Sequence, residues 1–174
     1  DKPVFMGISD ILRISADRTR FLLKRELEIE LGELQETWHF ASLEKIFIEN
    51  RIYRDIEECE TWEEILAAIH EGLKPHIKHL LREVTDEDVT RLTEIRIKRI
   101  SKFDSFKADE RIAALEEDID KVRHHLEHIT EYAIDWFKKL KAKYGKGRER
   151  KTELRTFAAI DRSKVAVANA KLYW

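Results

Sequence analysis

The first candidate for a functional segment in this chain is a basic stretch near the C-terminus, Tyr144–Leu154 (YGKGRERKTEL). It contains the cations Lys146, Arg148, Arg150 and Lys151. Such cations could contact the phosphates of a nucleic acid. The alternative is that the segment is a solvated C-terminal helix end, whose cations interact favourably with the negative end of the helix dipole. The segment is not a phosphate-binding P-loop, because no Gly-Lys-Ser/Thr follows a glycine at the required spacing.

A histidine group and a single cysteine are the other candidates. His124 and His128 have the spacing that places two ligands on one helix face, with His125 beside them. Counted from the neighbouring apolar positions, His124 and His128 lie on the outer, solvated face, so we expect no metal site. Cys59 is the only cysteine, which excludes an internal disulfide and fits a reducing cytoplasm. We expect no catalytic residue and no cofactor in this chain.

The composition favours long helices on a polar surface. Charged residues make up 39% of the 174 positions, yet the net charge is only −2, so opposite signs are paired as on exposed helix faces. Five glycines and two prolines leave few interruptions. No apolar run approaches the 20 or so residues that a membrane span needs. We therefore predict an all-α fold with no membrane partner.

Two long helical stretches, residues 17–57 and 105–144, should position these groups. Each carries a narrow apolar stripe with steps of three and four residues, which is typical of a coiled-coil seam. We predict a long antiparallel coiled-coil arm of residues 17–44 and 115–146, because each stripe would then cover the other. The predicted seam consists of Leu27, Leu31, Leu34, Trp38, Ile119, Val122, Leu126, Ile129, Trp136 and Leu140.

Residues 45–114 are predicted to form a small helical head between the two stretches. Thr61 and Glu64 form a capping-box pattern that opens a helix, and Gly72 is expected to end it. Thr85 is expected to open the next helix, and a single helix over 88–103 should carry a broad apolar face. Residues 1–16 are interpreted as the end of an upstream domain with a connector. Residues 147–174 are interpreted as a connector followed by a short β-like tail, the first strand of a C-terminal β domain.

Two motifs flanking the predicted arm resemble the A subunit of bacterial type IIA DNA topoisomerases, that is, DNA gyrase or topoisomerase IV. The first, Leu92–Ser101 (LTEIRIKRIS), matches a segment of the exit-gate head in that family. The second is the Tyr144-Gly145 turn with the basic pair Arg150-Lys151 and the following Thr-Glu-Leu. The likeness covers most of residues 8–155. The sequence has Lys102 where the family often has glycine, and this leaves the choice between gyrase and topoisomerase IV open.

The resemblance implies an exit-gate (C-gate) piece of an ATP-dependent enzyme that passes one DNA duplex through another. Two heads would associate as a homodimer, and we expect the contact at Leu92, Ile95, Ile97, Ile100 and Phe103. The catalytic tyrosine would belong to an upstream domain. Mg²⁺ and ATP would act through a partner ATPase, the B subunit of an A2B2 enzyme, which binds double-stranded DNA in the cytoplasm.

Two other interpretations stay open. The chain could be a helical arm that binds RNA or DNA through residues 138–151, or a coiled-coil dimerisation scaffold with no link to DNA. Strong, salt-sensitive nucleic-acid binding by a monomer would favour the arm, whereas self-association with weak binding would favour the gate.

Overall fold

The computed structural model describes residues 4–57, 59–149 and 151–152. The helices, in chain order, are α1 (Ile8–Glu49), α2 (Trp62–Leu73), α3 (Asp86–Thr93), α4 (Ile97–Ser101), α5 (Ser105–Glu127) and α6 (Ile129–Tyr144), with short 3₁₀ turns at Ile52–Arg54 and Ile77–His79. The described residues contain no strand, so the predicted all-α class is confirmed. The predicted β-like tail lies outside the described residues. The chain divides into two units between Asp135 and Trp136, and each is considered by itself.

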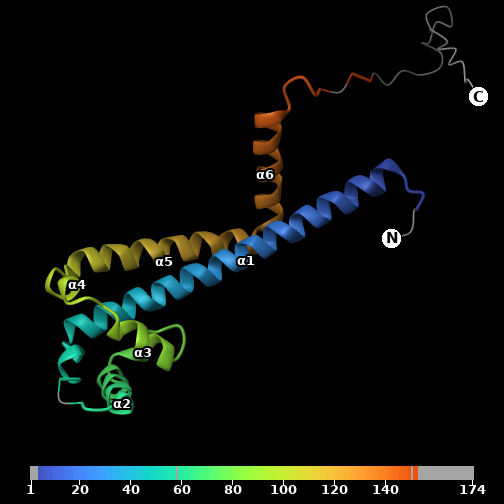
Figure 1. Ribbon diagram of the computed structural model, residues 1–174. Helices are drawn as coiled ribbons and strands as arrows, with labels where there is room; N and C mark the ends of the chain where they lie inside the picture. Colours follow the sequence, from blue (N-terminus) through green and yellow to red (C-terminus); the bar gives the residue numbers. More distant parts are fainter. Residues whose placement is uncertain (1–3, 58, 150, 153–174) are drawn as a thin grey trace, which may run out of the picture. The chain divides into compact units, whose positions relative to one another are not determined.

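In the first unit, α1 and α5 lie side by side and run in opposite directions (Figure 1). The indole N–H of Trp38 in α1 donates to a carboxylate oxygen of Glu116 in α5 at 3.0 Å. One heptad further along α1, Lys45 contacts Asp109, one heptad back along α5. This matched stepping is what an antiparallel pair of helices with heptad stripes requires.

The side chains of the predicted seam that belong to this unit are either buried or partly buried. Leu27, Ile119 and Val122 are buried. Partial burial is found for Leu31, Leu34, Trp38, Leu126 and Ile129. Trp136 and Leu140 belong to the second unit, so their pairing with α1 stays a prediction.

The bounds of the two long helices differ from those that the sequence predicts. α1 begins at Ile8 rather than at residue 17, and it ends at Glu49 rather than at residue 57. Just past that end, Arg51 adopts a left-handed backbone with φ of 56°. The second long stretch is interrupted at His128, where φ is −110° and ψ is 40°. There the His128 amide and its ring Nδ1 both donate to the carbonyl oxygen of His124, each at 3.0 Å.

The head is built around a core to which the last turns of α1 contribute. The buried side chains of this core are Leu43, Phe47, Ile48, Ile52, Ile69, Leu73, Val89 and Leu92. Capping boxes open α2 at Thr61 and α3 at Thr85. Each satisfies two backbone N–H groups that the first helical turn leaves without partners. The polar start signals in the sequence therefore predicted the start of α2 and of α3 correctly.

Gly72 does not end α2, which runs to Leu73. A Cβ at Gly72 would lie 2.8 Å from Cγ2 of Ile52. Glycine is therefore needed here because the Ile52–Arg54 turn packs directly against α2. The sequence alone does not reveal this close approach.

The single helix predicted over 88–103 is also wrong. It is replaced by α3 and α4, because Arg96 between them is extended, with φ of −66° and ψ of 138°. The Arg96 carbonyl accepts the amides of Arg99 at 2.7 Å and Ile100 at 3.3 Å, which starts α4 in a new direction. The turn leaves Ile100 partly buried against the core and Ile97 outside it.

Candidate functional site

An apolar hollow at the tip of the head is the surface best suited to contact another protein. Its lining residues are Phe47, Tyr53, Ile56, Glu57, Leu92, Thr93, Ile95, Ile97 and Ile100, and we call it the tip hollow. The rings of Phe47 and Tyr53 pack edge to face with centroids 6.3 Å apart. This aromatic contact joins two of the side chains that line the hollow.

Ile97 is the exposed apolar residue among those that line the tip hollow, with 83% of its surface accessible. Ile95, Ile100 and Phe103 are partly buried against the head core. Leu92 is fully buried in that core, so it supports the hollow from beneath and is not part of the exposed surface. An isolated exposed isoleucine is ordinary, but one at the rim of an apolar hollow marks a candidate contact.

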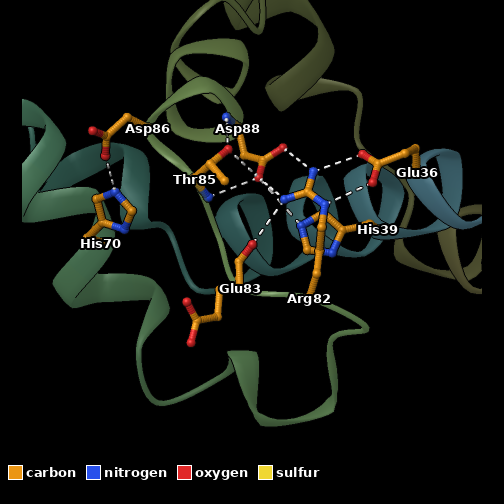
Figure 2. Close-up of polar contacts among 8 residues, drawn as sticks. All are labelled: Glu36, His39, His70, Arg82, Glu83, Thr85, Asp86 and Asp88. Atoms are coloured by element: carbon orange, nitrogen blue, oxygen red, sulfur yellow. Dashed lines mark hydrogen bonds and ion pairs between the residues drawn. The ribbon is translucent and has the colours of Figure 1, made fainter.

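Arg82 joins the arm to the head (Figure 2). Its guanidinium donates to both carboxylate oxygens of Glu36 in α1, at 2.9 and 2.8 Å. It also donates to both oxygens of Asp88 in α3, at 2.6 and 2.9 Å. Two bidentate pairs on one planar fork fix direction as well as distance. The loop before α3 therefore holds the head in one orientation on α1.

The carboxylates of this network are held in their charged forms. Burial alone would raise the pKa of Asp88, but the hydrogen bonds from Arg82 and Thr85 outweigh it and hold that pKa well below its usual range. The hydrogen bond from Arg82 also lowers the pKa of Glu36. The hydrogen bonds to both carboxylates raise the pKa of Arg82 in turn.

His39 is buried beneath this network on α1, with 1% of its surface accessible. Its ring Nε2 lies 3.6 Å from a carboxylate oxygen of Asp88, beyond hydrogen-bond distance. Among the residues that the structure describes, neither ring nitrogen has a hydrogen-bond partner. Burial, and then the positive charge of Arg82, lower the pKa of His39, so the ring is neutral at pH 7.

A second charged contact ties α4 to the arm. Glu44 of α1 is buried, and one of its carboxylate oxygens accepts from Nη2 of Arg99 at 2.7 Å. Near this point Ser105 contacts Glu49, at the junction of α5 with α1. Together with Lys45 and Asp109, these pairs set the register of α5 on the last turns of α1.

The described part of the basic segment lies in the second unit. Lys146, Arg148 and Lys151 are exposed, whereas Arg150 lies outside the described residues. Gly147 adopts a φ of 79°, and its amide donates to the Glu149 carboxylate at 3.0 Å. The segment is therefore a turn that follows α6.

The histidines and the rest of the described chain provide no cluster suited to a metal. The rings of His124 and His128 lie 4.3 Å apart between centroids. Among the described residues, no group of three or more histidine, cysteine or acidic side chains could hold a metal ion. No helix in that part of the chain is long and apolar enough to cross a membrane.

Sequence reasoning missed the arm–head network of Glu36, His39, Arg82 and Asp88. Glu36 and Arg82 are 46 residues apart, and no local pattern links them. One local sequence pattern involved this network, the run from Thr85 to Asp88. That pattern marks a helix start, but it does not identify Arg82 as the partner of the Asp88 carboxylate. A histidine at position 39, directly after Trp38 of the predicted seam, was the other available signal.

The first unit is thus an antiparallel pair of long helices, α1 and α5, with a small helical head that carries the apolar tip hollow. The sequence profile of the family described as the DNA gyrase/topoisomerase IV A subunit matches residues 1–141. The A subunit of DNA topoisomerase 4 from Borreliella burgdorferi is 33% identical over 171 residues, which is 98% of this chain. The chain therefore belongs to the A-subunit family of DNA gyrase and topoisomerase IV. It spans 27% of the length of that relative. No solved structure matches it significantly.

Proposed function

We propose that this chain is the exit-gate region of the A subunit of a type IIA topoisomerase, in which two copies meet through their heads. The arm would hold the contact away from the site of DNA cleavage, and the head would open transiently to release the transported duplex. The observation that carries this proposal is the tip hollow with Ile97 exposed at its rim. A second head is the occupant that would cover this face, because a two-fold contact is the commonest closed symmetry.

The activity of the whole protein is part of the same proposal. The parent would be an ATP-dependent, cytoplasmic DNA topoisomerase that acts with an ATPase, the B subunit, in an A2B2 complex on double-stranded DNA. Mg²⁺ and ATP would bind through that partner, and the chain itself would contribute mechanical coupling. Membership of the family supports this larger setting.

The arm–head network supports the mechanical part of the proposal. A gate that must stay shut under load needs a head that cannot swivel on its arm. Arg82 supplies this through four charge-assisted hydrogen bonds to Glu36 and Asp88, which come from the arm and from the head. The pair between Arg99 and Glu44 adds a second link, on α4.

The first test measures self-association of the chain in solution. We expect light scattering to give twice the mass of one chain at about 10–50 µM, the range of a modest protein contact. Ile97→Asp should weaken the association about tenfold or more, because it places a charge in an apolar contact. Leu81→Asp is the matched control, since Leu81 is an exposed leucine of the head outside the tip hollow.

A monomer at these concentrations, or equal loss in the two variants, would contradict the gate proposal. Tight, salt-sensitive nucleic-acid binding by such a monomer would favour the helical nucleic-acid-binding arm instead. A dimer that resists Ile97→Asp would place the contact elsewhere on the chain.

A further inference from the structure

Two adjoining surface hollows of the first unit gather positive charge along α3, α4 and α5. One is lined in part by Arg99, Lys102, Lys107 and Arg111, and the other in part by Arg91, Arg96 and Arg99. Arg99 is common to both, so the cations form one continuous surface. We call Arg91, Arg96, Arg99, Lys102, Lys107 and Arg111 the basic strip.

The basic strip stands out against the charge of the chain. Its six cations share the two hollows with only three carboxylates, those of Glu44, Glu94 and Asp104. The chain as a whole has a net charge of −2. One surface is therefore positive on an otherwise weakly acidic protein, which favours an anionic partner at that surface.

Two arginines of the strip are held in place while their head groups stay accessible. Arg99 is anchored by buried Glu44, yet 58% of its side chain is exposed. The guanidinium of Arg91 lies 4.1 Å from the centroid of the Phe40 ring. Holding an arginine in this way lowers the conformational entropy that is lost when it binds an anion.

The charges of the other four cations are little neutralised by carboxylates in the described part of the chain. Arg96, Lys102 and Arg111 make no ion pair within the part of the chain that the structure describes. Lys107 lies 3.5 Å from Asp104, but its side chain is 78% exposed. These four side chains can therefore reorient toward an external anion at small cost.

We propose that the basic strip binds the phosphate backbone of a DNA duplex without reading its sequence. The cations are spread over three helices and two hollows, which suits a chain of phosphates better than one enclosed anion. Four of the six are arginines, whose planar forks match phosphate oxygens. Phe40 and Phe103, the aromatic rings that line the two hollows, are partly buried, so neither hollow itself offers an exposed ring for stacking on bases.

This contact is separate from the proposed head-to-head contact. Ile95 lines both the tip hollow and the hollow that holds Arg91, Arg96 and Arg99, but no cation of the strip lines the tip hollow. Binding to DNA and self-association can therefore be tested with different variants of the same chain. The inference stands or falls independently of whether two heads associate.

The test is fluorescence anisotropy of a labelled, random-sequence duplex of about 30 base pairs, titrated with the full chain at several salt concentrations. The strip variant is Arg96→Ala, Lys102→Ala and Arg111→Ala together. These three residues make no ion pair in the described chain, so their loss should leave the melting temperature unchanged. The matched control is Arg13→Ala, Arg20→Ala and Lys24→Ala, which removes three exposed cations of α1.

We expect the strip variant to bind about tenfold or more weakly and its salt slope to fall by about 2.7, which corresponds to three lost phosphate contacts. The α1 control should change binding less than about twofold, as a small loss of general charge would. Equal loss in both variants would overturn the proposal. So would binding that is lost only when Lys146, Arg148 and Lys151 are replaced by alanine.

Two competitors distinguish the duplex from other anions. Inorganic phosphate at constant ionic strength should not displace the duplex, and displacement at millimolar phosphate would overturn the proposal in favour of an isolated anion site. Poly-glutamate should compete at least about tenfold less well than unlabelled duplex of equal charge, because it lacks the phosphate groups that arginine forks fit. Equal competition would overturn the choice of DNA as partner.

Discussion

Arg82 shows how one side chain can fix the relation between two parts of the chain. It binds Glu36 on the arm and Asp88 in the head, and its hydrogen bonds keep both carboxylates charged. His39 lies under this network, and its ring nitrogens have no hydrogen-bond partner in the described part of the chain. The buried groups therefore have opposite preferences, since Asp88 favours its charged form and His39 its neutral form.

This arrangement predicts how stability depends on pH. The pKa of His39 is lowered by burial and then by Arg82, so the unfolded chain takes up this proton first as pH falls. The contribution of neutral His39 is fully present above its unfolded pKa of about 6.5 and is lost as pH falls through the lower folded value. We expect urea unfolding to show a loss from pH 7 to pH 5 of at most about 1.4 kcal/mol per pH unit from this group.

His39→Gln should flatten that part of the profile, whatever its effect on stability at pH 7. His76→Gln serves as the control, because His76 is exposed. A profile that stays unchanged in His39→Gln would show that this histidine does not titrate as the buried geometry requires. Asp88 does not interfere, because its lowered pKa keeps it charged throughout this range.

At the scale of elements, local signals in the sequence predicted more than long-range contacts did. The polar starts at Thr61 and Thr85 and the heptad stripes depend on neighbours in sequence. They identified α2, the start of α3 and the helical character of the two long stretches. The interruption at His128 and the turn at Arg96 have neither glycine nor proline to mark them. At His128 the structure shows a ring–carbonyl hydrogen bond, and after Arg96 it shows Ile100 packed on the head core. Neither contact can be read from the sequence.

Two helical glycines provide a matched test of the packing between elements. Gly72→Ala should lower the free energy of unfolding by about 1 kcal/mol, because the new Cβ would meet Ile52 and overpacking outweighs the better helix propensity. Gly32→Ala in α1 should raise it by about 0.5–1 kcal/mol, since nothing lies within 4 Å of the new Cβ. Urea unfolding measures both. Stabilisation by both changes would mean that the turn at Ile52–Arg54 does not pack on α2 as described.

At the scale of the whole molecule, the first unit contains the arm of α1 and α5 and the head on the end of α1 (Figure 1). The sequence predicted the all-α class and, through two motifs, the family. The sequence did not reveal the arm–head network or the basic strip, because their members come from segments distant in sequence. The proposed contacts, the tip hollow for a second head and the basic strip for DNA, lie on different residues of the same head.

The central claim is that two copies of this chain meet through the tip hollow, and site-directed cross-linking tests it most directly. In a Cys59→Ser background, Ile97→Cys is treated with a short bifunctional maleimide at about 20 µM protein, and Leu81→Cys is treated in the same way. We predict a covalent dimer as the main product for Ile97→Cys and only a trace for Leu81→Cys. Equal cross-linking of the two variants, or none with Ile97→Cys, would contradict the account.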